Sequence, residues 1–524
     1  MRARRRSWFG EAALVSTVLL ATGWTALAGA QQDDPVLTAE EWELALKAQE
    51  QLEENPPRTE QKGLLSVGPD VTIIDLSGVG NYTSGGGTPC PPGYEGNCRG
   101  YSIGTNSCNI GTVPVDWCDQ PFDCRTTTDA YHLVAPATVT DHSVIAQNVY
   151  RLKDGRFEQI GQSFLKHGFL STNSPDAGCM WNDNGTPNSS CVGPPAGGDQ
   201  LGLGCTDFYG SSLNGGRPLG RRSQVNAADA DHPENPAGGE VDDDYDQRIV
   251  VQETDLDPSL NPDALYWVEG QYVVRDDARS GRSAVPGNVH PWLGENGLNN
   301  ASYRQVVVGD LPALNLTMTG PTVRETAAIF AWQAADPGVD IVEVDRQTLF
   351  PGDPIDPPAA PGFYLDHRVL ERFHAARRVT ATGNPGTPYH YEYAIHNLNS
   401  DTGSDGFLVE FPAAATFANI GFHDVDHHSG EPYDTSDWTV TVDGPNGTVS
   451  WAAVPAGANT NALRWGTAFS FWFDASRPPD DISEWLDLFK IQETRFIRFP
   501  ELSFQIFSDG FETGDTSAWS LTEN

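Results

Sequence analysis

The hydrophobic and polar positions along the chain follow the pattern of many short β-strands separated by turns. Within 389–396, aromatic or aliphatic residues alternate with more polar ones, which predicts a half-buried strand. Runs rich in β-branched and aromatic residues, bounded by turn-forming residues, predict strands at 71–76, 144–151, 249–253, 266–274, 373–380, 389–396, 406–410, 438–442, 448–452 and 467–473. The close spacing of the last six runs is typical of a β-sandwich. We therefore expect a mainly β protein with at least one β-sandwich domain in its C-terminal part.

Turn and linker signals divide the chain into five parts. Thr38 and Glu41 have the form of a capping box, which predicts a short helix to about Leu52. Because the second large part has its own strands and contains no cysteine, we expect it to fold alone. The five expected parts are an export signal at 1–30, an acidic leader at 31–64, a loop-rich β domain at 65–337, the β-sandwich domain at 338–505 and a tail at 506–524.

The first thirty residues have the composition of an export signal. Four arginines precede a mostly apolar stretch at 12–27, and Ala28 and Ala30 offer a cleavage site before Gln31. The stretch is short and rich in small residues for a membrane span. A general secretory leader is preferred over a twin-arginine signal and over a retained anchor helix. We expect a secreted or cell-surface protein with no integral membrane segment in the mature chain.

All eight cysteines fall between Cys90 and Cys205. An even number in an exported chain predicts up to four disulfide bonds, which would order the loop-rich stretches at 78–125 and 172–247. Eight cysteines allow roughly a hundred pairings, so the connectivity stays open, with Cys179–Cys191 as one example of a pair. A zinc cluster is disfavoured because the sequence has no C-x-x-C pair.

The charge balance narrows the class of partner. The chain has 71 Asp and Glu against 32 Lys and Arg, a formal net charge of −39. A nucleic-acid partner would need a basic face, which the sequence does not show. The same charge disfavours an anionic lipid surface and favours the binding of cations.

Several segments resemble a module that recurs in uncharacterised secreted bacterial proteins. They read YEYAIHNLNSD at 391–401, GFHDVDHHSGEPY at 421–433 and NALRWG at 461–466, and the segment 148–169 resembles another part of the same group. The resemblance implies no established activity, so no functional residue is transferred. The tail resembles a C-terminal D-G-F-E-x-G segment of exported proteins of environmental bacteria, which implies export or surface handling.

The densest set of transition-metal ligands lies at 423–428. It contains His423, Asp426, His427 and His428, and imidazole with carboxylate suits zinc, copper or iron. On a strand, His423 and His427 would be roughly 13 Å apart, too far to share one ion, whereas Asp426 and His428 would be close enough. The alternative is a polar strand end that leads into a turn. A lone histidine, His167, is interpreted as structural.

A second candidate metal site lies in an acidic stretch at 229–246. Asp242, Asp244 and Asp246 would offer hard oxygen ligands suited to Ca²⁺, and Glu253 falls where the twelfth position of a calcium loop would be. Gln247 stands where that loop needs glycine. The alternative is a solvated acidic loop. Calcium is nevertheless the expected ion, because crowded carboxylates repel one another.

No complete catalytic motif is found. The sequence has neither H-E-x-x-H nor a phosphate-binding G-x-x-x-x-G-K-[ST]. Ser102 lies in a G-x-S-x-G sequence, but the strand and helix that a nucleophile elbow needs are not predicted around it, so we interpret the segment as a turn between disulfides.

The sequence therefore predicts an exported binding or structural protein without catalytic activity. Its expected partner is an extracellular glycan or protein, and nucleic acid is excluded. Trp438, Trp451, Trp465 and Trp472 would serve either as sugar-stacking faces or, more often in a sandwich, as core residues. The alternative function is a metal-dependent enzyme that acts on an extracellular polymer.

Overall fold

The structure is a computed structural model. It describes the chain from Gly68 to Phe499 apart from 118–142, 192–199, 231–244, 283–290, 350–367 and a number of shorter gaps. The predicted export signal, the leader helix and the tail lie outside the described residues. The chain is mainly β, as predicted, and is built from antiparallel sheets. No helix in the described part is both long and apolar enough to cross a membrane.

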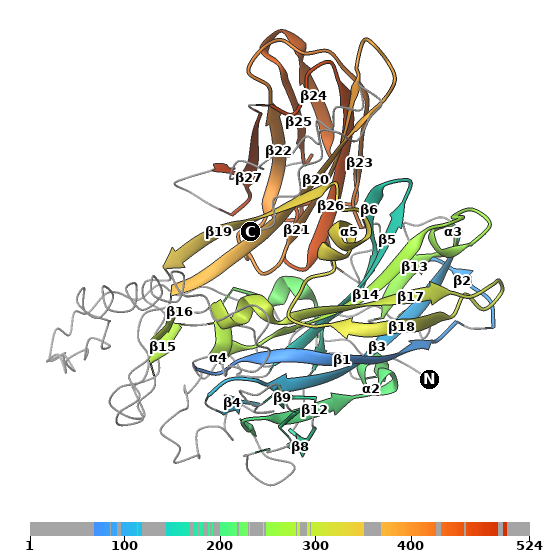
Figure 1. Ribbon diagram of the computed structural model, residues 1–524. Helices are drawn as coiled ribbons and strands as arrows, with labels where there is room; N and C mark the ends of the chain where they lie inside the picture. The colour runs from blue at the N-terminus through green and yellow to red at the C-terminus, as the bar shows by residue number, and fades with distance from the viewer. Residues whose placement is uncertain are drawn as a thin grey trace, which may run out of the picture.

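The N-terminal part contains two six-stranded sheets that pack on each other (Figure 1). Their facing sides share one hydrophobic core, to which β-branched and aromatic residues of both sheets contribute. The first sheet consists of β1 (Val71–Asn81), β2 (Thr88–Pro89), β3 (Asn97–Asn109), β8 (Ser174–Pro175), β12 (Cys205–Tyr209) and β13 (Ile249–Gln252). The second consists of β5 (Val144–Lys153), β6 (Arg156–Gln162), β7 (Lys166–His167), β14 (Leu265–Val273), β17 (Ala301–Val308) and β18 (Leu316–Val323).

Short elements complete the N-terminal part. Three two-stranded sheets pair β4 (Val115–Asp116) with β11 (Gln200–Leu201), β9 (Met180–Trp181) with β10 (Pro187–Asn188), and β15 (Ser280–Arg282) with β16 (Pro291–Leu293). The helices are α2 (Ser211–Gly216), η2 (Arg222–Gln224), α3 (Glu253–Leu256), α4 (Arg275–Ala278), η3 (Glu295–Asn299) and α5 (Phe330–Ala335).

The C-terminal part is sandwich-like, as predicted. Two five-stranded sheets enclose a core dominated by aromatic side chains, in which Tyr391, Phe407, Trp451, Phe471 and Phe473 are fully buried. The first sheet runs in the order β19 (Val339–Leu349), β20 (Arg368–Ala381), β21 (Tyr389–Asn397), β26 (Thr467–Ala475) and β23 (Phe417–His423). The second runs in the order β24 (Thr439–Asp443), β25 (Thr448–Ala452), β22 (Ser404–Glu410), β27 (Ser483–Leu488) and β28 (Phe496–Arg498), with η4 (Gly444–Asn446) between β24 and β25.

The strand β3 corrects the expectation that 78–125 is a long loop. Its residues are mostly glycine, serine, asparagine and threonine, yet all but the first are buried. β1 and β2 pair along one side of β3, while β12 and β13 pair along the other. Small residues suit this central position, because a Cβ at Gly104 would lie 2.4 Å from Ser77 Oγ and 3.1 Å from the Ser211 nitrogen. Close packing, rather than hydrophobic alternation, therefore determines this strand.

The strand β21 corrects a second expectation, because it is buried on both faces instead of one. Tyr391 and Tyr393 point into the sandwich core, as the alternation predicted. The opposite face carries Glu392 and His396, which are 3% and 1% exposed. This face packs against the N-terminal part, so its polar residues are buried in the contact between the two parts rather than solvated.

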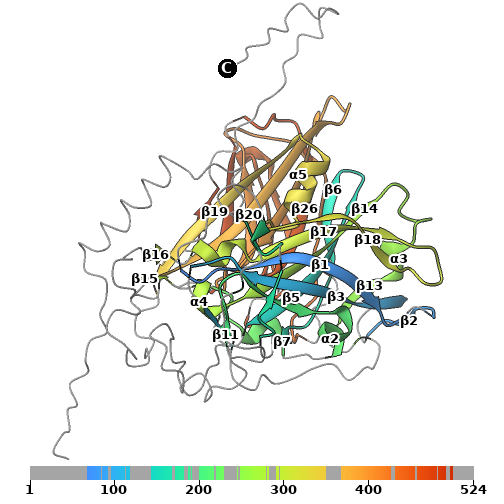
Figure 2. The same cartoon turned by 60° about the horizontal axis from the view of Figure 1, so that its bottom comes forward.

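The two parts meet in a closely packed contact. Figures 1 and 2 show the C-terminal sandwich, in orange and red, standing on the N-terminal sheets. One hydrophobic cluster joins Phe157 and Trp267 of the N-terminal part with Ala394 and Ala468 of the C-terminal part. Polar contacts lie beside it, since Ser470 Oγ donates to the Phe157 carbonyl at 2.6 Å.

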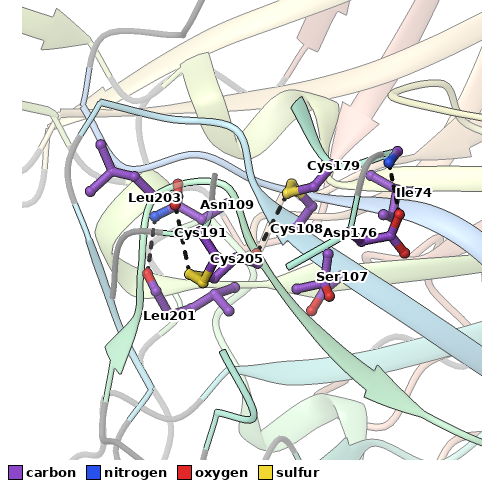
Figure 3. The surroundings of a disulfide bond; sticks show 12 residues. Ile74, Ser107, Cys108, Asn109, Asp176, Cys179, Cys191, Leu201, Leu203 and Cys205 are labelled. Carbon is purple, nitrogen blue, oxygen red and sulfur yellow. Dashed lines mark hydrogen bonds between the residues drawn. A yellow bond between two sulfur atoms is a disulfide. The ribbon is translucent and has the colours of Figure 1, made fainter. Parts of the chain in front are cut away.

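Three disulfide bonds lie in the described residues of the N-terminal part, which confirms a disulfide-tied β region. The example pair Cys179–Cys191 was wrong: the two residues bond elsewhere, each to a cysteine on a central strand of the first sheet (Figure 3). Cys118 and Cys124 lie outside the described residues, and none of the described cysteines is free. The bonds are Cys90–Cys98, Cys108–Cys179 and Cys191–Cys205.

Candidate functional site

Of the cluster predicted to hold a transition metal, the structure describes only His423. It is the last residue of β23 and lies opposite Ser470 of β26, half-buried. Its Nε2 is buried and has no hydrogen-bond partner in the part of the chain that the structure describes. Asp426, His427 and His428 lie outside that part, so the transition-metal site stays a prediction.

The residues predicted to bind calcium, Asp242, Asp244 and Asp246, also lie outside the described residues. Tyr245, which lies between Asp244 and Asp246 in the sequence, is fully buried. It donates a hydrogen bond to the Cys98 carbonyl at 2.9 Å. Among the described residues, no group of three or more His, Cys, Asp or Glu side chains is arranged to hold a metal ion. Calcium binding by this loop stays a prediction.

The G-x-S-x-G sequence at 100–104 lies in the middle of β3, so the expectation of a turn was wrong. Ser102 is fully buried, and its Oγ donates to the Ser211 carbonyl at 2.6 Å. A nucleophile elbow would instead place the serine on a sharp turn between a strand and a helix. His167 lies in the two-residue strand β7, opposite Val144.

A pocket at the contact between the two parts is a candidate site. Its lining residues surround about 480 Å³ of space, but that volume includes open solvent, and only a small part of it is enclosed. Three aromatic side chains and several charged ones line it. The lining residues are Gln162, Arg222, Ser223, Val225, Asp401, Glu431, Tyr433, Ala462, Arg464, Trp465, Thr467, Phe489 and Lys490.

The pocket gathers segments that are far apart in the sequence. Gln162 ends β6, and Asp401 follows β21. Glu431 lies between β23 and β24, and Arg464 lies before β26. Each of these four residues comes from a different one of the segments 148–169, 391–401, 421–433 and 461–466. The pocket is therefore the place where those segments meet.

Two contacts between the N-terminal and C-terminal parts hold the lining of the pocket in place. Glu431 accepts hydrogen bonds from the Ser223 backbone nitrogen at 2.8 Å and from Ser223 Oγ at 2.6 Å. The indole Nε1 of Trp465 donates to the carbonyls of Arg222 and Val225, at 3.0 and 3.1 Å. The indole is 4% exposed, so this tryptophan is structural rather than a free stacking surface.

Arg222 is a buried cation in the lining of the pocket. Its guanidinium donates to the carbonyls of Ser163, Gln147 and Gly466 at 2.8 to 2.9 Å. Burial lowers the pKa of Arg222 to about 10, and the nearby Glu269 charge opposes that shift. Gly466 has a φ of +70°, and a Cβ there would lie 2.7 Å from Arg222 Nη1, so the site needs glycine.

Arg464 is the more accessible cation of the pocket. Its guanidinium carbon lies 3.8 Å from the centre of the Tyr433 ring and 4.8 Å from that of Phe489, distances typical of cation–π contacts. Nη2 donates to the carbonyls of Ala458 and Thr460, whereas Nε is buried without a hydrogen-bond partner among the described residues. Burial lowers the pKa of Arg464, but the guanidinium keeps its charge at neutral pH.

The pocket is less acidic than the chain as a whole. Its lining has three cations, Arg222, Arg464 and Lys490, against the two carboxylates Asp401 and Glu431, although the Arg222 charge is also offset by the buried Glu269. Lys490 Nζ lies 2.8 Å from Asp401 Oδ1 at the partly exposed rim. Burial raises the pKa of Glu431, while its hydrogen bonds from Ser223 and the nearby arginines oppose the rise. In a chain of net charge −39, a pocket without an excess of negative charge is a place where an anionic ligand meets the least repulsion.

A second charged cluster lies on the face of β21 that packs against the N-terminal part. His390 is within hydrogen-bond distance of two carboxylates, with Nε2 2.8 Å from Glu392 and Nδ1 2.6 Å from Asp474. The hydrogen bond with Glu392 is the main reason that the pKa of His390 is raised, and burial opposes the rise. Arg156 forms two hydrogen bonds to Glu392 and covers the Trp472 ring at 3.3 Å. This cluster therefore links the two parts electrostatically.

Comparison with known proteins adds little to this description. No protein-family profile matches the chain, and no curated protein matches it. Among solved structures, the N-terminal domain of the Streptococcus gordonii adhesin Sgo0707 aligns over 84% of this chain and 96% of its own, at 11% identity and a TM-score of 0.14. A likeness this weak informs neither fold nor function.

Sequence reasoning missed the pocket, although it had noted the segments that form it. Glu431 and Arg464 are single charged residues in loops, with no spacing that marks a ligand set. The segments that form the pocket lie in separate parts of the chain, and no local pattern indicates that they meet. Trp438, Trp451 and Trp465 are 2%, 1% and 4% exposed, which agrees with the interpretation of these tryptophans as core.

Proposed function

We propose that the protein is an exported binding protein without catalytic activity, and that it binds the acidic group of a glycan at the mouth of the pocket between its two parts. The observation that carries the proposal is the charged guanidinium of Arg464, which lines this pocket of a strongly acidic chain and whose Nε is buried without a hydrogen-bond partner among the described residues. The guanidinium of Arg464 and the ammonium of Lys490 would bind the sugar carboxylate, since charge-assisted hydrogen bonds are the stronger ones. Gln162, Asp401 and Thr467 would accept or donate hydrogen bonds with sugar hydroxyls.

Further observations support secretion and the binding of a glycan. The export-type leader and the disulfide bonds both favour a location outside the cytoplasm. The pocket is concave and lies between two closely packed parts, the position where small-ligand sites are frequent. A metal-dependent enzyme, the alternative function, depends on the cluster at 423–428, and it stays a prediction.

The test is calorimetric titration of the purified protein with an oligogalacturonate and with its carboxyl-reduced, neutral counterpart. The acidic oligosaccharide should bind and the neutral one should bind at least tenfold more weakly, because a hydrogen bond to a charged group contributes about 1.5–3 kcal/mol. Arg464→Gln should weaken the acidic ligand by about tenfold or more. Arg498→Gln is the matched control, since Arg498 is exposed on β28, away from the pocket.

Two results would overturn the proposal. Equal binding of the acidic and neutral oligosaccharides would remove the role of the anionic group. An unchanged affinity in Arg464→Gln, with acidic binding intact, would place the site elsewhere on the protein.

A further inference from the structure

Two buried histidines lie against each other at the contact between the two parts. His374 of β20 and His396 of β21 are 3% and 1% exposed, and their rings stack with centroids 5.5 Å apart. The first residue of α5, Phe330, meets the His374 ring edge-on at 5.2 Å. Figure 1 shows α5 at the junction, just before the chain enters the C-terminal sandwich. The histidine pair therefore lies beside the segment that connects the two parts.

The geometry of the pair leaves room for only one proton between the rings. The two Nδ1 atoms are 3.2 Å apart, so one Nδ1–H donates and the other Nδ1 accepts. If both rings were protonated, two N–H groups would face each other across this distance. His396 Nε2 is buried without a hydrogen-bond partner among the described residues, so a proton there has no acceptor. The closed contact therefore disfavours the protonated pair.

The charges around His374 add to this effect. Glu343 Oε1 on β19 lies 4.0 Å from His374 Nε2, but the same oxygen already pairs with Arg372 at 2.8 Å. Burial lowers the pKa of His374 well below its usual value, and the charges of His396 and Arg372 lower it further. A proton on His374 would therefore compete with Arg372 for Glu343.

The charges around His396 largely oppose one another. Burial lowers the pKa of His396, while Glu269 of β14 raises it and Arg222 of η2 lowers it. Ala468 of β26, which lies opposite His396, carries no charge. His396 is therefore neutral near pH 7, like His374.

The other elements beside β20 and β21 bring carboxylates that mostly have cationic partners already. The sequences of α5 and β16 contain no charged residue, and η3 contributes Glu295. The ion pairs that involve β6, β21 and β26 are Arg151–Glu158, Arg156–Glu392 and His390–Asp474. An added proton on the histidine pair therefore gains little from these groups.

The apolar contact between the two parts is modest on the side of the sandwich. The C-terminal part supplies three alanines, Val339 and Leu398 to the shared hydrophobic cluster, whereas Phe157 and Trp332 come from the N-terminal part. Because a methyl group buries little area, hydrophobic burial holds the sandwich to the N-terminal sheets less firmly than it holds each core together. Polar groups at the junction therefore contribute strongly to whether it stays closed.

We propose that the His374–His396 pair is an acid-sensitive switch, and that mildly acidic conditions open the contact between the two parts while each part stays folded. In the open state both imidazoles reach water and titrate near their ordinary pKa of about 6.5. The closed state binds fewer protons, so closure is complete above about pH 6.5 and weakens as the pH falls below it, by up to about tenfold per pH unit for each proton. Opening would also release a ligand from the pocket, a consequence that rests on the proposed function.

The test is hydrogen exchange of the full-length protein without ligand, resolved to single amides and corrected for intrinsic exchange. The Ala468 nitrogen donates to Gln159 Oε1 across the contact at 2.7 Å, so its protection reports closure. Between about pH 7.5 and pH 5 this amide should lose at least tenfold in protection. Amides of β3 and β25, inside the two parts, should keep theirs.

The double variant His374→Gln with His396→Gln should keep the Ala468 protection at pH 5, because its side chains take up no proton. His423→Gln is the matched control, a histidine at the other edge of the same sheet, and it should respond like the wild type. If the double variant does not fold, His396→Gln alone should make the response less steep by about one proton.

Three results would overturn the proposal. The first is unchanged Ala468 protection in the wild type down to pH 5, and the second is a loss that persists in the double variant. The third is an equal loss in β3 and β25, since the whole chain would then unfold instead of the contact opening. Because no ligand is present, each result is independent of whether the pocket binds a glycan.

Discussion

Replacing Arg222 by methionine tests how the two parts are held together. Arg222 is 6% exposed, and its guanidinium bonds to carbonyls of both parts, including Gly466 at 2.9 Å. It also donates to Asn148 Oδ1 at 2.9 Å. Methionine fills a similar volume but donates no hydrogen bond and carries no charge, so the variant removes the polar function while largely keeping the packing.

The expected loss of stability follows from the carboxylate that Arg222 balances. Glu269 is 0% exposed and accepts hydrogen bonds from Tyr150 at 2.9 Å, from Asn148 at 2.8 Å and from the Ala328 nitrogen at 2.6 Å. Asn148 therefore bridges the cation and the anion. Arg222→Met leaves buried acceptors without their donor, among them the Gly466 carbonyl and Asn148 Oδ1, and it removes the favourable charge interaction with Glu269. Since each unsatisfied buried group costs about 1–3 kcal/mol, we expect a loss of about 3 kcal/mol or more.

Urea denaturation, followed by tryptophan fluorescence and circular dichroism, measures this loss where the two transitions coincide. The double variant Arg222→Met with Glu269→Gln should recover part of it, because the unbalanced charge is removed. Arg372→Met is the control, and it should lose at most about 1 kcal/mol, since Arg372 pairs with the more exposed Asp345. A loss below about 1 kcal/mol for Arg222→Met, or strictly additive effects in the double variant, would refute the reasoning.

Three further predictions concern histidines and cysteines. His390 has a raised pKa in the folded state, so its contribution is complete below about pH 6.5 and is lost as the pH rises through the folded value. His390→Gln should therefore lower the urea midpoint more near pH 6 than near pH 9, and an equal effect at both would contradict the assignment. His374 is buried beside His396, and burial lowers the pKa of His374 well below its usual value, as do the charges of His396 and Arg372. Stability should fall as the pH drops below about 6.5, where the unfolded chain gains protons, and His374→Gln should flatten that fall in pH-dependent melting curves. Non-reducing peptide mapping should recover the pairs Cys90–Cys98, Cys108–Cys179 and Cys191–Cys205, and any other partner for these residues would contradict the structure.

Features that depend on a few neighbouring residues were predictable from the sequence. The strand at 448–452 has the same bounds as β25, because β-branched residues and a tryptophan alternate there between turn-forming residues. The mainly β class, the C-terminal sandwich and a disulfide-tied N-terminal region follow from the same local patterns and from an even number of cysteines. Local alternation also determined which face of β21 carries the aromatic core residues. The domain boundaries and the export signal remain predictions.

Features that depend on contacts between distant segments were decided only by the tertiary structure. The pairing of cysteines is one, since Cys108 bonds to Cys179, 71 residues away, and local sequence does not select that partner. The burial of Glu392 is another, because a second part of the chain covers a face that alternation alone predicts to be solvated. The pocket is the third: Gln162, Ser223 and Arg464 share a site because two sheets pack together. Short-range patterns describe what each segment prefers, whereas the partners that satisfy its buried charges and polar groups are supplied by the packing of the whole chain.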